Sequence, residues 1–129
     1  KPKEAYLARD LLCVFEDDEA VRRMTPDQAL LAKLPGLLQH ATAASADPQF
    51  DCVSRSFAPK LAVAEDPVCG SGHCHIVPYW AARLGKASIT AFQASKRTGV
   101  LYCRLADERI EMAGDAVLYS EAVIDSGEE

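Results

Sequence analysis

The order of apolar and polar residues divides the first half of the chain into short elements. Alternating or continuous apolar positions predict three strands, over residues 7–15, 37–45 and 50–58. Between the first two, Thr25-Pro26-Asp27-Gln28 has the composition of a helix start, with a capping residue, a proline at the first helical position and a glutamine that reaches back. The apolar leucines that follow predict a helix that Pro35-Gly36 ends.

The second half has one apolar helix followed by strands. The helix is expected over residues 73–84, ended by Gly85, and its nearly continuous apolar surface predicts burial on most sides. Turn residues then separate four short strands that read as an antiparallel meander, over residues 87–95, 99–105, 109–113 and 116–124. The polar tail at 125–129 is expected to fray. The predicted fold class is α+β, with an antiparallel, barrel-like sheet wrapped around a central buried helix.

Length and charge narrow the class of protein. The 129 residues correspond to a single domain, 1–129, with enough sequence for a core of its own. The net charge is −5 and the 14 basic residues are scattered, which argues against nucleic acid or an anionic membrane as a partner. No apolar run of membrane-spanning length and no apolar signal region is present, so a cytoplasmic location is expected. The first residue is Lys1 rather than Met, which suits a tag remnant, a processed product or a piece of a longer chain.

The segment EDPVCGSGHCHIVP, residues 65–78, concentrates the reactive side chains of the chain. A zinc site needs four converging ligands, and no second ligand pair accompanies Cys69 and His73, so no metal is expected. A redox motif of the thioredoxin type has two residues between its cysteines, whereas four separate Cys69 from Cys74. With five cysteines, an odd number, a disulfide framework is not expected either.

The same segment predicts an anion site at a helix start. Gly70, Ser71 and Gly72 precede the predicted helix, where the first backbone amides have no partners within the helix. Such a position also stabilises a thiolate, so Cys69 is a candidate for a reactive thiol. Asp66, three residues upstream, is a candidate for hydrogen bonding to a ligand or for proton transfer.

Simpler interpretations of these residues stay open. The two glycines would suit any tight turn into a helix, a serine at this place is a common helix cap, and Asp-Pro is a common turn. His73 and His75 are, by residue type alone, more often structural or exposed than catalytic.

Three long blocks resemble one family. FAPKLAVAEDPVCGSGHCHIVPYWAARLGK, ITAFQASKRTGVLYCRL and ERIEMAGDAVLYSEAVI are similar to the C-terminal domain of the phenazine-biosynthesis (PhzF-like) isomerases, and the resemblance covers nearly the whole chain. It implies the fold of diaminopimelate epimerase, in which two similar α+β domains meet at the active-site cleft. Family catalysis uses side-chain acids and bases without a metal or other cofactor. The best known member moves a proton within a dihydro-hydroxyanthranilate ring.

The resemblance assigns roles to several residues. Asp66 matches the active-site aspartate that contacts substrate, and Ser71 with Gly70 and Gly72 matches the carboxylate-binding helix start, beside His73. Cys69 stands where many members have threonine. It either fills that space or, by analogy with the Cys-Gly-Thr-Gly of diaminopimelate epimerase, acts as a proton-transfer residue. The expected ligand is a small carboxylate-bearing metabolite.

The family's general-base glutamate and a substrate-holding histidine belong to the N-terminal domain, which nothing in this sequence resembles. Three hypotheses follow. The chain is the C-terminal domain of a cofactor-independent isomerase; or it is half of a homodimeric, cysteine-based racemase; or it is a non-catalytic binding module. The missing domain or a second copy of the chain would be the protein partner.

Overall fold

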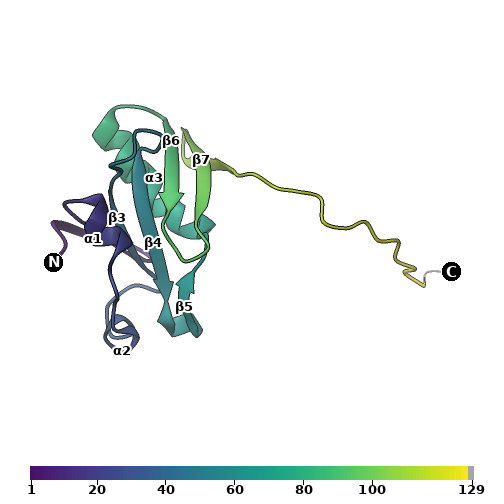
Figure 1. Ribbon diagram of the computed structural model, residues 1–129, viewed down its shortest axis with the longest axis horizontal. Coiled ribbons are helices and arrows are strands. Elements are labelled where there is room, and N and C mark those ends of the chain that lie inside the picture. The colour runs from purple at the N-terminus through teal and green to yellow at the C-terminus, as the bar shows by residue number, and fades with distance from the viewer. Residues whose placement is uncertain (128–129) are drawn as a thin grey trace.

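A computed structural model describes residues 1–127 and contains one sheet of eight strands with a long helix against it (Figure 1). The strands are β1 (Glu4–Leu7), β2 (Leu11–Val14), β3 (Gln39–Ala44), β4 (Cys52–Ala58), β5 (Val63–Asp66), β6 (Ser88–Gln93), β7 (Gly99–Ala106) and β8 (Arg109–Ala113). The helices are α1 (Asp18–Arg22), α2 (Gln28–Leu31), the 3-10 turn η1 (Pro59–Leu61) and α3 (Gly70–Leu84).

The sheet is mixed and open, not antiparallel and barrel-like as the sequence predicted. Its strand order is β1-β2-β3-β4-β6-β7-β8, and β5 pairs with the end of β4 that β6 leaves free. The pairs β2–β3 and β4–β6 are parallel, and the others are antiparallel. Parallel neighbours need a long crossover connection, and the chain provides two, one carrying α1 and α2 and the other carrying β5 and α3. The predicted meander is confirmed for β6, β7 and β8.

Helix α3 is buried along one face rather than on most sides. Its buried residues form a single stripe, Gly72, His73, Ile76, Val77, Trp80 and Ala81. This stripe shares the main core with residues of the sheet such as Ile89 and Leu101. The indole Nε1 of Trp80 donates a hydrogen bond of 2.9 Å to Oγ1 of Thr42 on β3. The helix is therefore fixed to the sheet by packing and by buried polar contacts such as this one, with its other faces at the surface.

Several element bounds differ from the predictions for local reasons. The predicted strand over 7–15 is a hairpin whose turn contains Asp10, and α2 is capped by Asp27 rather than Thr25. Helix α3 begins at Gly70, three residues earlier than predicted. The predicted strand over 116–124 forms no ladder and runs away from the domain (Figure 1). Of the predicted frayed tail, residues 128–129 lie outside the described part. Within residues 1–127, no helix has the length and apolarity needed to cross a membrane.

Candidate active site

A three-residue loop joins β5 to α3, and the residues that the sequence singled out lie in it or next to it. Asp66 is the last residue of β5 and Cys69 is the N-cap of α3. The thiol Sγ of Cys69 accepts a hydrogen bond of 3.3 Å from the amide of Gly72. The amides of Gly70 and Ser71 have no hydrogen-bond partner within residues 1–127. Of the three predicted anion-binding positions, two therefore present unoccupied N–H donors.

Gln93, at the end of β6, fixes both ends of this loop. Its side chain is fully buried. Its Oε1 accepts a hydrogen bond of 2.8 Å from the amide of Cys69, and its Nε2 donates one of 2.6 Å to the carbonyl of Asp66. One amide side chain thus satisfies a donor and an acceptor of the loop backbone, which sets where Asp66 lies relative to the helix start.

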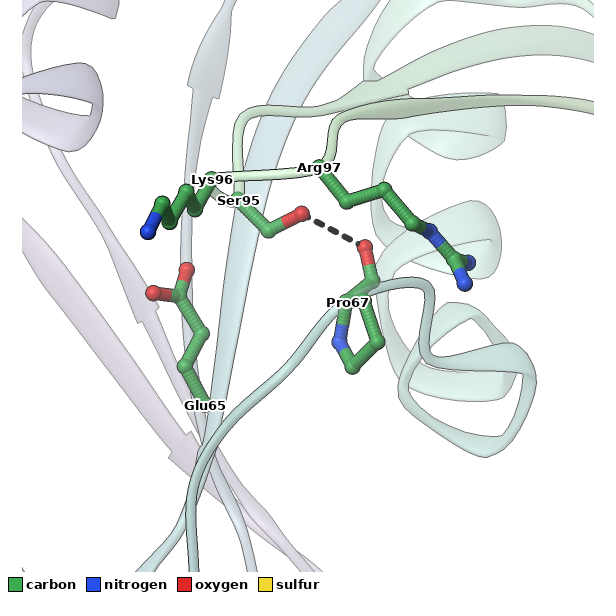
Figure 2. Close-up of a pocket in the computed structure, with 5 residues that line it drawn as sticks. All are labelled: Glu65, Pro67, Ser95, Lys96 and Arg97. Atoms are coloured by element: carbon green, nitrogen blue, oxygen red, sulfur yellow. Dashed lines mark hydrogen bonds between the residues drawn. The ribbon is translucent and has the colours of Figure 1, made fainter.

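A second contact holds the loop from the turn after β6 (Figure 2). Ser95, which is 5% exposed, donates from Oγ to the carbonyl of Pro67 at 2.7 Å. The amide of Thr98 donates to the same Oγ at 3.1 Å, which ties the turn to the loop. Glu65, Pro67, Ser95, Lys96 and Arg97 line a surface hollow of about 420 Å³ at this junction.

Asp66 is partly buried and combines a structural contact with access to solvent. Its Oδ1 accepts a hydrogen bond of 3.1 Å from the amide of Val68, an Asx turn at the start of the loop. Its strand position lies directly opposite Ser56 of β4, so the two side chains share one face of the sheet. That face is the one that packs against α3, because Ser54 and Ser56 contact histidines on that side.

Cys69 does not have the environment of an activated thiol. Its side chain is only 2% exposed. Burial raises the pKa of the Cys69 thiol, and the opposing hydrogen bonds from Ser71 and from the Gly72 amide do not compensate. The expectation that the helix start favours its thiolate is therefore wrong for this chain. In the structure Cys69 is a helix cap.

His73 lies in the interior rather than on the ligand side. Its ring is fully buried, with Nδ1 donating to the carbonyl of Cys69 at 2.7 Å and Nε2 accepting from Ser54 Oγ at 3.4 Å. Burial lowers the pKa of His73, so the ring is neutral at ordinary pH. The structure thus brings Asp66, Cys69, Gly70 and Ser71 together and places His73 beneath them as a support.

A buried chain of polar groups, which we name the Asp10–His40–Ser56 chain, lies below the start of α3. His40 Nδ1 is 2.9 Å from Ser56 Oγ, and His40 Nε2 is 3.1 Å from Asp10 Oδ2. Burial opposes ionisation of Asp10, but hydrogen bonds from Arg9 and His40 outweigh it and lower its pKa to about 2. Burial lowers the pKa of His40 despite Asp10, so the pair is a carboxylate with a neutral imidazole.

This chain explains why residue 72 is glycine. A Cβ atom at Gly72 would lie 2.7 Å from Cε1 and 2.9 Å from Nδ1 of His40, and 3.1 Å from the Sγ of Cys69. Any side chain there would displace the imidazole or the first turn of α3. Gly72, one of the predicted anion-binding residues, is thus required for packing against the imidazole of His40.

The surface beside these amides is hollowed. A space of about 640 Å³ borders Gly70 and includes Arg97, Thr98 and Met112 in its lining. Among residues 1–127, no group of three or more histidine, cysteine, aspartate or glutamate side chains is arranged to hold a metal ion. All five cysteines are free thiols. The polar groups that border this surface are the two available amides and the partly buried carboxyl group of Asp66.

Some residues of the site could not be identified from the local segment alone. Gln93, Ser95 and Arg97 lie in the block QASKR, which the sequence presents only as part of the family resemblance. The sequence did offer one signal for Gln93, because it is a polar residue at an inward-facing position of a predicted strand, and a buried side-chain amide needs hydrogen-bond partners. His40 and Ser56 gave no such signal, since their contacts join β3 to β4.

Comparisons with known proteins agree on one family. The sequence model described as "Phenazine biosynthesis-like protein" matches residues 4–122. An uncharacterized isomerase of Pseudomonas aeruginosa is 52% identical over 114 residues, which are 88% of this chain and 43% of the relative. A second uncharacterized isomerase of that organism is 41% identical over 122 residues, 94% of this chain and 46% of the relative. The chain therefore spans about half the length of the curated relatives it matches.

Solved structures of phenazine biosynthesis proteins also match this chain over about half of their own length. A phenazine biosynthesis protein of the PhzF family from Enterococcus faecalis aligns with a TM-score of 0.81 at 41% identity, over 92% of this chain and 48% of the other. A putative phenazine biosynthesis PhzC/PhzF protein from Clostridium difficile aligns with a TM-score of 0.86 at 38% identity, over 97% of this chain and 48% of the other. The loop, the helix start and the strands that hold them all fall within the matched region.

Proposed function

Since the chain belongs to the phenazine biosynthesis-like protein family, whose Pseudomonas relatives are named isomerases, we propose that it forms one wall of an isomerase active site. The reaction moves a proton within a small metabolite that carries a carboxylate group. Side chains alone transfer the proton, with Asp66 as the acid or base that this chain contributes.

The two available amides at the start of α3 carry this proposal. Gly70 and Ser71 present adjacent N–H donors at the positive end of a fifteen-residue helix, and a carboxylate is the natural ligand of such a position. Asp66 lies at the start of the loop that leads to these amides, and Gln93 holds both ends of that loop by hydrogen bonds. A ligand carboxylate fixed at the amides would place its neighbouring carbon within the region that Asp66 borders, and orientation of this kind lowers the barrier to proton transfer.

The opposite wall of the site is supplied by another domain or by a second copy of this chain. Apolar side chains between residues 117 and 124 are 80–103% exposed, at Val117, Leu118, Tyr119, Val123 and Ile124. An exposed apolar segment of this length favours association with a partner surface. A racemase that uses paired Cys69 thiols is the weaker alternative, because Cys69 is buried and its pKa is raised.

Binding of acetate tests whether the amides of Gly70 and Ser71 form an anion site. In a ¹⁵N-labelled sample, we expect acetate to shift the amide signals of Gly70 and Ser71 in a saturable manner. The amide of Gly72 is the internal control, because Cys69 already accepts its hydrogen bond. If the three signals move equally, or if Gly70 and Ser71 do not move, the anion site does not exist.

Catalysis is tested separately by hydrogen exchange in D₂O. The chain, alone at high concentration and joined to its other half, is incubated with a panel of small carboxylic acids while carbon-bound protons are followed by NMR. An Asp66→Asn variant should lose exchange by about 10²-fold or more, the usual contribution of a positioned acid or base. Equal exchange with Asp66→Asn would rule out its role and favour a non-catalytic binding module.

A further inference from the structure

Arg97 is an unpaired cation beside the candidate site. Six of the eight arginines form ion pairs with carboxylates of residues 1–127, whereas Arg97 and Arg109 do not. Arg97 is exposed. An incoming anion can therefore bind its guanidinium without breaking an existing ion pair, and arginine can bind a carboxylate with two parallel hydrogen bonds.

The turn that carries Arg97 is fixed to the loop that carries the amides. Ser95 donates to the carbonyl of Pro67, and Thr98 closes the turn in the left-handed region at φ 61°. A Cβ atom at Gly99 would lie 2.4 Å from Cγ2 of Val68, so turn and loop approach as closely as a glycine allows. Left-handed backbone at a non-glycine residue costs energy and persists only where the surroundings hold it. The backbone of Arg97 is thus held in a defined position relative to Gly70.

Arg97 and Gly70 border the same hollow. Both residues line the space of about 640 Å³, and Arg97 also lines the adjacent space of about 420 Å³. Figure 2 shows the Arg97 side chain extended past Pro67, on the side away from Lys96 and Glu65. Asp115 is a carboxylate in the lining of the larger hollow, and it is not within ion-pair distance of Arg97. The hollow is thus bordered by Gly70, one of the two residues with an available amide, and by the unpaired Arg97.

We propose that Arg97 determines specificity for substrates with two anionic groups. One carboxylate binds the amides of Gly70 and Ser71, and Arg97 binds the second, so the substrate class is the dicarboxylates. This inference rests on the proposed function of the helix start. Arg97 is a binding residue and takes no part in proton transfer.

The experiment compares glutarate with its monomethyl ester, which has nearly the same size and one charge fewer. Both are titrated at constant ionic strength into ¹⁵N-labelled protein, and the signals of Gly70, Ser71 and the Arg97 side-chain Nε are followed. Glutarate should bind about four- to tenfold more tightly than the ester, because a largely exposed ion pair contributes about two- to fivefold and either of its two identical carboxylates can occupy the amides, which adds about twofold. An Arg97→Gln variant should lower that preference to about twofold. The matched control, Arg109→Gln, removes the other unpaired arginine and should leave it unchanged.

The outcomes separate this inference from the proposal on which it rests. If both ligands shift Gly70 and Ser71 but glutarate binds no more than about twofold more tightly, or if Arg97→Gln keeps the original preference, the anion site stands and the role of Arg97 is refuted. If neither ligand shifts the two amides, the anion site itself fails, and the dicarboxylate inference fails with it. Movement of the Arg97 Nε signal by glutarate alone supports direct contact.

Discussion

Replacement of Gln93 tests whether one side chain holds the candidate site in place. A Gln93→Leu substitution keeps a side chain of similar size but removes both hydrogen bonds to the loop. The amide of Cys69 would then be left without a partner in a buried position, and the carbonyl of Asp66 in a partly buried one. An unsatisfied buried group costs about 1–3 kcal/mol, so the Cys69 amide alone predicts a loss of about 1–3 kcal/mol in the free energy of unfolding, and the Asp66 carbonyl adds a smaller cost.

Urea unfolding provides the measurement. Trp80 is the single tryptophan and is 5% exposed, so its fluorescence reports the loss of the core between α3 and the sheet. Gln49→Leu is the matched control, because Gln49 is exposed and the same change there should cost less than about 0.5 kcal/mol. Hydrogen exchange at the Cys69 amide should accelerate in Gln93→Leu more than exchange in β7.

Two results would refute the reasoning. A free energy of unfolding for Gln93→Leu within about 0.5 kcal/mol of the original value would show that water or a shift of the loop replaces both contacts. Alternatively, stability could fall while exchange at Cys69 stays unchanged relative to β7, which would show a general packing defect. A Gln93→Glu variant adds a second check. Its carboxyl group can satisfy both partners only when protonated, so it should regain stability as the pH falls towards acid.

Three further predictions concern packing, acid stability and thiol reactivity. Gly99→Ala should destabilise the chain by about 1–3 kcal/mol through overpacking against Val68. Gly114→Ala is the control and should not destabilise it, because a Cβ atom there meets only one ordinary contact at 3.6 Å. Calorimetric melting temperatures of the two variants make the comparison. Burial lowers the pKa of His73, so as the pH falls below about 6.5 the unfolded chain binds a proton at this residue before the folded chain does. The contribution of His73 to stability is therefore present above that pH and lost below it. Urea midpoints that stay flat from pH 7 to 5 would contradict this. Iodoacetamide at pH 8 should alkylate the exposed Cys74 well before the buried Cys69, as peptide mass spectrometry will show, and the reverse order would restore Cys69 as a reactive thiol.

The sequence predicted the existence of most elements better than their pairing. The hairpins of β6, β7 and β8 followed from alternation and turn residues, because neighbouring strands in a meander are close in sequence. The parallel pairs β2–β3 and β4–β6 could not be predicted in this way, since the alternation of apolar and polar residues is the same for either strand direction. Helix α1 was missed because its acidic start reads equally well as a turn, and Asp17 as a cap is evident only once the helix is seen.

The candidate site divides in the same way. A loop that leads into a helix start was predicted correctly, because caps and glycines are local signals. Strand β5, which ends at Asp66, was not predicted, and the helix begins three residues earlier than expected. What the amides and side chains contact was not predictable, since Gln93 and His40 arrive from other strands. The raised pKa of Cys69 also depends on burial, which no spacing within the loop determines.

The exposed segment after β8 has a practical consequence for work with this chain. Residues 117–124 combine high β-propensity with a backbone that makes no ladder, which is the composition of a segment prone to intermolecular strand pairing. We expect light scattering from the purified chain to rise with protein concentration and with ionic strength, as its net charge of −5 is screened. Storage conditions and yield then depend on this short stretch more than on the stability of the sheet and helix.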